Sequence, residues 1–131
     1  MAALEECCTR VLDALERGAA GSSGSSPAGV LHAVGGAYAE LVADRDLLML
    51  RVHAQAATDE PAIASTVRRG IGRVTDFART RSLAGPDEIQ RFMAFGQLCH
   101  LLTTIEAFDV EEPWASTLTD GIRRSGPEKG R

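Results

Sequence analysis

Apolar residues recur every three or four positions along most of the chain, which is the repeat of one face of an α-helix. The first such row, within 2–17, consists of Leu4, Cys8, Val11 and Leu15. No stretch alternates between apolar and polar residues as a half-buried strand does. Aromatic residues, which favour strands, make up only 5% of the chain. The sequence therefore predicts an all-α fold, a bundle of about five to six helices.

Capping residues and turn signals indicate where the helices begin and end. Gly18 is expected to close the first helix, because glycine readily adopts the conformation that ends one. Ser26 and Pro27 favour the start of a second helix, and Asp44 is expected to cap a third. The helices are expected over 2–17, from Pro27 onward, over 45–57, 61–81 and about 86–108, and in a short segment after Pro113.

The chain is expected to form one domain. Its 131 residues and 13.9 kDa suffice for a single hydrophobic core. We place that domain over 1–122, with a flexible Gly- and Ser-rich loop at 21–29 and a polar tail at 123–131.

Charge and apolar run lengths narrow the classes of function. Fourteen Lys and Arg against 18 Asp and Glu give a net charge of −4, whereas nucleic-acid binding needs clustered positive charge. No apolar run approaches the length of a membrane span, and the first residues lack the layout of a secretion signal. Three cysteines do not make a disulfide framework. We therefore expect a cytoplasmic protein that does not associate with membranes.

Catalytic, metal and cofactor chemistry is not expected. Cys99 and His100 are neighbours, and successive residues of a helix point about 100° apart, so His100 is not placed to act as a base for Cys99. The three histidines lie in three different predicted helices, without the spacing of metal ligands. No glycine-rich phosphate-binding motif follows a strand. A small helical enzyme that uses Cys99 and His100 stays open as an alternative.

The segment 86–108 differs from the other predicted helices because apolar residues occupy almost its whole circumference. These residues are Ile89, Phe92, Met93, Phe95, Leu98, Cys99, Leu101, Leu102, Ile105 and Phe108. A helix that is apolar all round is buried all round. In so small a domain, one face would pack on the chain's own core and the other on a second copy. The pattern thus predicts a homodimer.

Three motifs in a fixed order resemble a known family. They are ADRDLLML at 43–50, DEPAI at 59–63 and FMAFGQL at 92–98. Together they resemble the C-terminal effector-binding and dimerisation domain of TetR-type bacterial transcriptional regulators. The resemblance covers about residues 1–122. It implies an all-helical domain that pairs through a four-helix bundle, two helices from each copy, and regulation of transcription, with repression the expected mode.

The resemblance also implies a small-molecule effector bound among the helices, and the apolar character of those helices favours a largely apolar molecule. The candidate ligand-binding residues combine apolar bulk with polar tips near helix centres; they are Tyr38, His53, Met93, Cys99 and His100. The candidate dimer-interface residues lie in the last two helices; they are Phe95, Leu98, Leu102, Ile105, Trp114 and Leu118. A role of Trp114 in covering the chain's own core stays equally open.

The family reads DNA through an N-terminal helix-turn-helix, which this chain does not contain. Its first helix resembles the connector that follows such a head, so DNA binding is expected only through a head domain outside this sequence. The alternative function is a stand-alone helical protein-interaction module that binds no small molecule.

Overall fold

The computed structural model describes residues 2–22 and 24–122. Within these ranges the chain is all-α, as predicted, with six α-helices, one short 3-10 helix and no strand. The elements are α1 (Ala2–Ala20), α2 (Pro27–Val42), α3 (Arg45–Ala56), α4 (Pro61–Ser82), α5 (Pro86–Thr104), η1 (Ala107–Asp109) and α6 (Pro113–Thr119). The tail predicted over 123–131 lies outside the described residues.

Side-chain caps start α2 and α3 as predicted. The Ser26 hydroxyl accepts a hydrogen bond from the backbone N–H of Gly29 at 3.2 Å. Asp44 Oδ1 accepts one from the backbone N–H of Leu47 at 3.3 Å. Each bond satisfies a donor that has no carbonyl partner in the first helical turn. Arg10 also donates to Asp44 at 3.1 Å, and these hydrogen bonds lower the pKa of the Asp44 carboxyl.

α1 and α2 form a tightly packed pair. A Cβ atom added at Gly18 would lie 2.8 Å from Ala37 Cβ and 2.9 Å from the Ala33 carbonyl oxygen, so no side chain fits there. The prediction that Gly18 ends the first helix is therefore wrong. The helix continues to Ala20, and the glycine serves the close approach of two backbones. The buried residues shared by this pair are Val11, Leu15, Ala19, Val30 and Val34.

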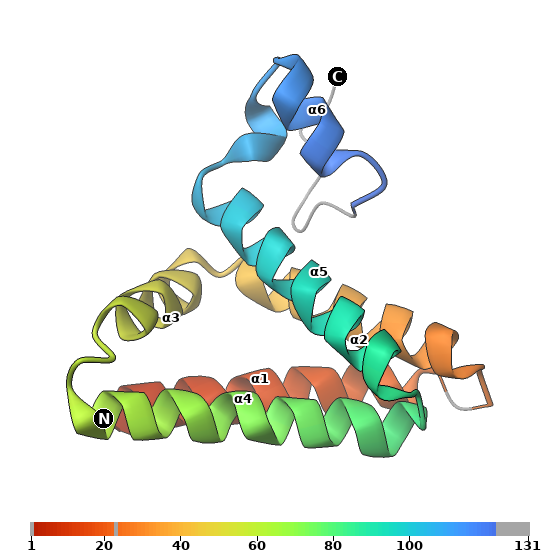
Figure 1. Ribbon diagram of the computed structural model, residues 1–131, viewed down its shortest axis with the longest axis horizontal. Coiled ribbons are helices and arrows are strands. Elements are labelled where there is room, and N and C mark those ends of the chain that lie inside the picture. Colours follow the sequence, from red (N-terminus) through yellow and green to blue (C-terminus); the bar gives the residue numbers. More distant parts are fainter. Residues whose placement is uncertain (1, 23, 123–131) are drawn as a thin grey trace.

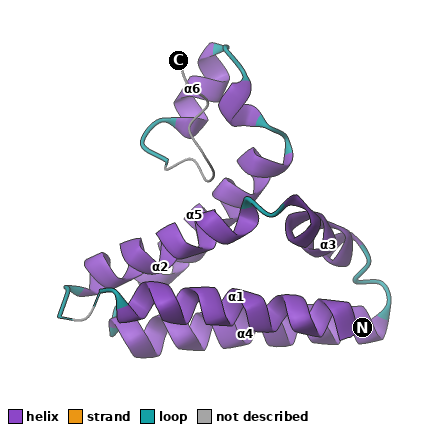
Figure 2. Cartoon of the chain, turned by 180° about the vertical axis from the view of Figure 1, so that it is seen from behind, coloured by secondary structure: helices purple, strands orange, loops and turns teal. Residues whose placement is uncertain are grey.

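α1 and α4 lie side by side and run in the same direction, whereas α2 and α5 run the opposite way (Figures 1 and 2). At one end of the α1–α4 pair, Arg81 donates to a Glu16 carboxylate oxygen at 2.6 Å. Further along, a Cβ added at Gly70 would lie 3.0 Å from Cys8 Sγ. These two pairs of neighbours show that α1 and α4 pack in parallel.

α4 and α5 diverge from the loop that joins them, and α3 lies across their open end (Figure 1). The loop reverses the chain through Leu83, which has a left-handed φ of 59°. A small buried cluster closes the narrow end; its members are Leu31, Ala78, Ala84 and Ile89. The three helices α3, α4 and α5 therefore outline a triangle, with α1 and α2 behind it in the view of Figure 1 and in front of it in that of Figure 2.

The predicted helix over 86–108 is interrupted after Thr104. Glu106 takes a left-handed φ of 57°, which ends the helix before η1 begins. The prediction is wrong here because the apolar pattern continues across a change in backbone direction. α6 packs on η1 and lies beyond the end of α5 instead of alongside it (Figure 1).

Candidate functional site

A cleft of about 920 Å³ lies along α5 and extends to both sides of this helix. Small-molecule sites usually have volumes of a few hundred to about 1,000 Å³. Most of the residues that line the cleft are apolar, and they come from α1 to α5 and from the segment after α6. The cleft exists because the buried cluster at Ala84 and Ile89 closes only one end of the α4–α5 pair.

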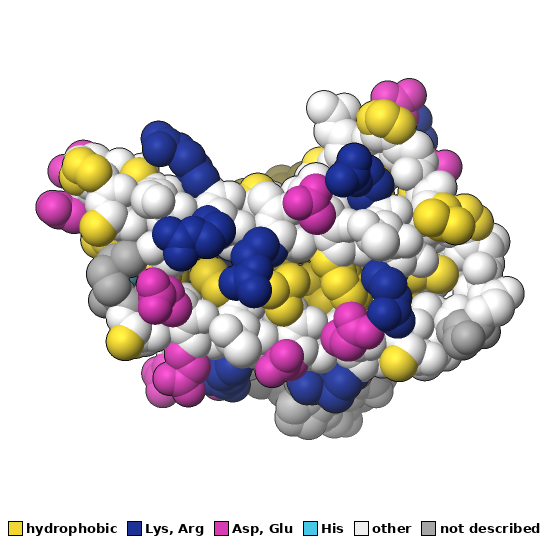
Figure 3. Space-filling model, turned by 90° about the horizontal axis from the view of Figure 1, so that it is seen from below, with side chains coloured by type: hydrophobic (Ala, Val, Ile, Leu, Met, Phe, Trp, Pro, Cys, Tyr) yellow, Lys and Arg dark blue, Asp and Glu magenta, His cyan; other side chains and the backbone are white. Residues whose placement is uncertain are grey.

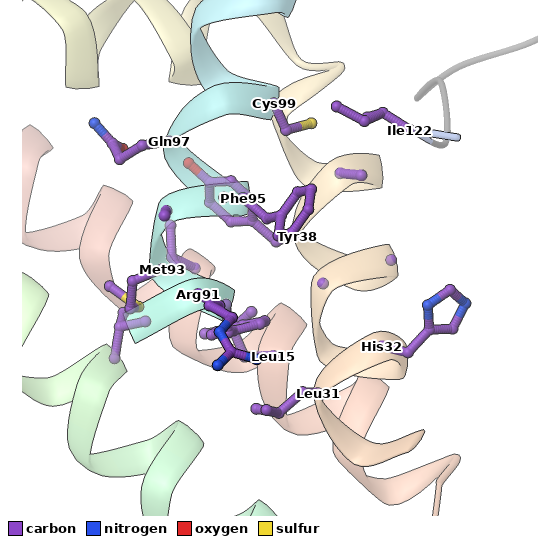
Figure 4. Close-up of a pocket in the computed structure, with 18 of the residues that line it drawn as sticks. Leu15, Leu31, His32, Tyr38, Arg91, Met93, Phe95, Gln97, Cys99 and Ile122 are labelled. Carbon is purple, nitrogen blue, oxygen red and sulfur yellow. The ribbon is translucent and has the colours of Figure 1, made fainter. Parts of the chain in front are cut away.

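α5 runs through the cleft and divides it into two parts. Met93 and Gln97 point to the side of α3 and α4, whereas Cys99 lies toward α2 and Ile122 (Figure 4). This division follows from helix geometry, because positions 93 and 97 share one face of α5 and position 99 lies on another. We call the part on the α3 and α4 side the inner cleft. Of the residues that line the whole cleft, we assign to the inner cleft Val11, Leu15, Tyr38, Arg51, Gln55, Ile71, Val74, Met93 and Gln97.

Polar groups gather where α3 crosses the wide end of the inner cleft. The Arg51 guanidinium donates a short hydrogen bond to the Tyr38 hydroxyl and lies 5.2 Å from the centre of the Tyr38 ring. Gln55 lies one helical turn further along α3 and also lines the cleft. Arg51 is half-buried and forms no ion pair with an Asp or Glu of the described residues.

The pKa values of three titratable groups in this region are shifted in the direction that favours the neutral form of each group. Burial raises the pKa of the Tyr38 hydroxyl, although Arg51 partly offsets this effect. Burial also raises the pKa of the Cys99 thiol. The pKa of His100 is lowered, first by burial and then by the positive charge of Arg51. Among the residues assigned to the inner cleft, Arg51 is the one with a charged side chain at neutral pH, whereas Glu88 and Arg91 line the rest of the cleft.

Three of the five residues predicted to bind a ligand line this cleft: Tyr38, Met93 and Cys99. The other two do not. His53 is exposed on α3 outside the cleft. His100 is buried, with 4% of its surface exposed, and its Nδ1 has no hydrogen-bond partner among the described residues. The side chains of Cys99 and His100 therefore lie apart, since Cys99 lines the cleft and His100 is buried outside it.

Sequence reasoning missed Arg51 and Gln55, although Arg51 carries a recognisable signal. It lies four residues after Leu47 and three before Ala54, both of which are buried. A charged residue at this spacing occupies the apolar face of its helix. Such a position indicates either an internal polar contact or a polar end of a binding site.

The residues predicted at a dimer interface fall into two groups. Phe95, Ile105, Trp114 and Leu118 are large apolar residues that stay substantially exposed, and Leu98 is half-buried. Leu102, in contrast, has no exposed surface, so the chain's own core already covers it. Its neighbour Leu101 is 51% exposed and was not predicted. The free apolar residues of this segment therefore include Leu101 where the prediction placed Leu102.

The arginines of α4 do not form a continuous basic surface. Arg68, Arg69 and Arg73 are exposed, and on the face seen from below the basic side chains are interspersed with acidic ones (Figure 3). Among the described residues, no group of three His, Cys, Asp or Glu side chains could hold a metal ion. In the same part of the chain, no helix combines the length and apolar character needed to cross a membrane.

Comparison of the chain with protein-family models, with curated proteins and with solved structures finds no match. What the structure establishes is an all-α architecture with six α-helices over residues 2–22 and 24–122. The resemblance to TetR-type regulators stays a hypothesis that rests on the three sequence motifs.

Proposed function

We propose that this chain is the effector-binding and dimerising part of a TetR-type transcriptional regulator, and that its effector is a small, largely apolar molecule. The observation that carries the proposal is the cleft of about 920 Å³ lined mostly by apolar side chains. Burial of apolar ligand surface would supply most of the affinity. DNA would be read only by a head domain outside this sequence.

The position of α1 offers a route from the cleft to such a head. Val11 and Leu15 belong to α1 and line the inner cleft, so a bound molecule would contact the helix that follows a DNA-reading head in the family. An effector changes the activity of a regulator only when it binds one arrangement of the protein better than another. We infer that the two arrangements differ in how α1 packs against α4 and α5.

The exposed apolar row of α5 supports pairing with a second copy. Ala94, Leu98 and Leu101 of α5 and Ile105 at its C-cap follow each other at intervals of four, three and four residues, the spacing found along the seams of paired helices. Leu98 is half-buried and the other three are exposed. Trp114 and Leu118 extend the exposed apolar surface onto α6. We propose that this α5–α6 surface is the dimer interface, with Leu101 in the place first assigned to Leu102.

A thermal-shift screen of small apolar compounds tests ligand binding. A ligand at a hundredfold its Kd adds about 2.7 kcal/mol to the stability of the folded state. Ile71→Trp should abolish the shift, because Ile71 lies in the wall of the cleft and is 38% exposed, so a larger ring can extend into the empty space. Leu83→Trp is the control, since Leu83 is 83% exposed and outside the cleft. The proposal would be contradicted if no compound in the library gave a thermal shift that Ile71→Trp reduces.

Light scattering after size-exclusion chromatography tests the dimer. Leu101→Glu should shift the wild-type dimer to a monomer, because a charge buried without a partner in an interface is costly. Ser65→Glu adds the same charge at an exposed position of α4 and should leave the dimer intact. A wild-type chain that elutes as a monomer at micromolar concentration would contradict this part of the proposal.

The exposed α5–α6 surface also fits the second function, a helical interaction module without a small-molecule ligand. The two functions differ in the thermal-shift screen, because only the effector-binding domain should respond to compounds through Ile71. The regulator assignment itself is tested in the gene: the reading frame upstream of Met1 should encode a basic helix-turn-helix.

A further inference from the structure

The inner cleft has a polar end and an apolar end. Arg51 and Gln55 lie at the wide end, on α3. Leu31, Ile89 and Ala78 close the narrow end, where Phe92 and Met93 pack against them. A molecule that fills the inner cleft would therefore meet a cation at one end and hydrocarbon at the other.

Among the described residues, no acidic side chain lies within ion-pair distance of the Arg51 guanidinium. Its known partner is the Tyr38 hydroxyl, which is neutral, and it forms no ion pair within the described part of the chain. Glu88 is the acidic residue among those that line the whole cleft. It precedes Gln97 by nine residues, roughly 13 Å of helix, toward the narrow end. A half-buried cation without a counter-ion is a ready partner for an anionic ligand group.

From this arrangement, and on the basis of the proposed effector-binding role, we infer that the ligand is an apolar monocarboxylate of the fatty-acid type. Its carboxylate pairs with the Arg51 guanidinium at the α3 end, and its hydrocarbon body lies along Leu15, Val74 and Met93. One guanidinium compensates one negative charge, so a monoanion fits better than a dianion. The hydrogen bond to Tyr38 and the stacking on its ring hold the guanidinium in position.

Isothermal titration with three probes that share one tail tests the inference. Decanoate, 1-decanol and decylammonium carry an anionic, a neutral and a cationic head, and each is used below its micelle-forming concentration at pH 7.5. Decanoate should bind about tenfold to a hundredfold more tightly than 1-decanol, because hydrogen bonds to charged groups contribute this much. Decylammonium should bind more weakly than both, because its charge would meet Arg51.

Two variants that each remove one positive charge show whether Arg51 is responsible. Arg51→Gln should reduce decanoate binding to the level of 1-decanol while 1-decanol binding stays within about threefold of wild type. Arg91→Gln removes a charge from an exposed residue of α5 that also lines the cleft, and it should keep the preference for decanoate. Tyr38→Phe should retain part of that preference, since it removes the hydroxyl that orients Arg51 but keeps the ring.

The outcomes separate this inference from the proposed function. Equal binding of decanoate and 1-decanol by the wild type would overturn the carboxylate assignment and leave apolar effector binding standing. A preference for decanoate that survives in Arg51→Gln would overturn the role of Arg51. Binding of none of the three probes would overturn the inference, while hits in the apolar screen that depend on Ile71 would still support the proposed function. Melting curves of the ligand-free variants show that each one is folded.

Discussion

The α1–α2 pair and the α4–α5 pair are built from similar helices but pack in opposite ways. In the first pair, Gly18 brings two backbones so close that an added Cβ would lie 2.8 Å from Ala37 Cβ. In the second, the helices touch near Ala84 and Ile89 and then separate. The first pair makes a closed core, and the divergence of the second leaves open space that is part of a cleft of about 920 Å³.

The difference shows how one small domain can be both stable and open. Small residues let α1 and α2 pack along their length, and the buried cluster between them includes the fully covered Leu15 and Val34. α4 and α5 pack on this pair and diverge from each other. Ile71 and Phe95 stay exposed, and no helix of the described residues covers them. A ligand or a partner that buried these side chains would gain the free energy of that burial.

Truncating one apolar residue in each pair should give the largest contrast. Leu15→Ala removes a side chain that is 1% exposed and should lower the free energy of unfolding by about 2–5 kcal/mol, through lost burial and a new cavity. Ile71→Ala removes as many carbon atoms from a residue that is 38% exposed, and it should cost less than about 1 kcal/mol. Urea unfolding followed by circular dichroism measures both. Equal costs would mean that the cleft is closed in solution.

Replacing a glycine with alanine, which adds one methyl group, tests the same comparison. Gly18→Ala should lower the free energy of unfolding by about 1–2 kcal/mol, because overpacking outweighs the roughly 1 kcal/mol by which alanine favours a helix. Gly72→Ala is the matched control in α4, where an added Cβ has no neighbour within 4 Å. It should stabilise the protein by up to about 1 kcal/mol. Stabilisation by both changes would show that α1 and α2 do not touch at Gly18.

The sequence predicted helix starts better than helix ends. Ser26 and Asp44 act locally, since each caps a backbone donor three residues away, and local rules identify them. Gly18 was misread because its reason is a contact with Ala33 and Ala37 on another helix. The break after Thr104 was missed because apolar residues continue on both sides of it. Long-range contacts and changes of direction leave no mark in a local pattern.

The candidate site was predictable only in part, for the same reason. Tyr38, Met93 and Cys99 have apolar bulk near helix centres, and the fold gathers them at one cleft. Whether His100 faces that cleft or the core depends on the rotation of α5, which periodicity gives only to within about one residue. Arg51 was overlooked because a charged residue is by default assigned to the surface. Its spacing from the buried Leu47 and Ala54 indicates that it lies on the apolar face of its helix.

A smaller effect on stability, seen only at acidic pH, should come from His100 in α5. Burial, and then the charge of Arg51, hold the pKa of His100 below its usual 6.5. The unfolded chain therefore takes up a proton below about pH 6.5 that the folded chain does not, and stability falls with pH from that point. His100→Leu should remove this loss between pH 6.5 and 5, as measured by thermal unfolding in a pH series. At pH 7.5 it should cost little, because the Nδ1 that it removes has no hydrogen-bond partner in the described part of the chain. His53→Leu, the same change at an exposed position, should retain the acid sensitivity of the wild type. If the pH profile of His100→Leu were parallel to that of the wild type, the group responsible for the acid sensitivity would be another one. His100 would then be reached by enough water to take up a proton in the folded protein.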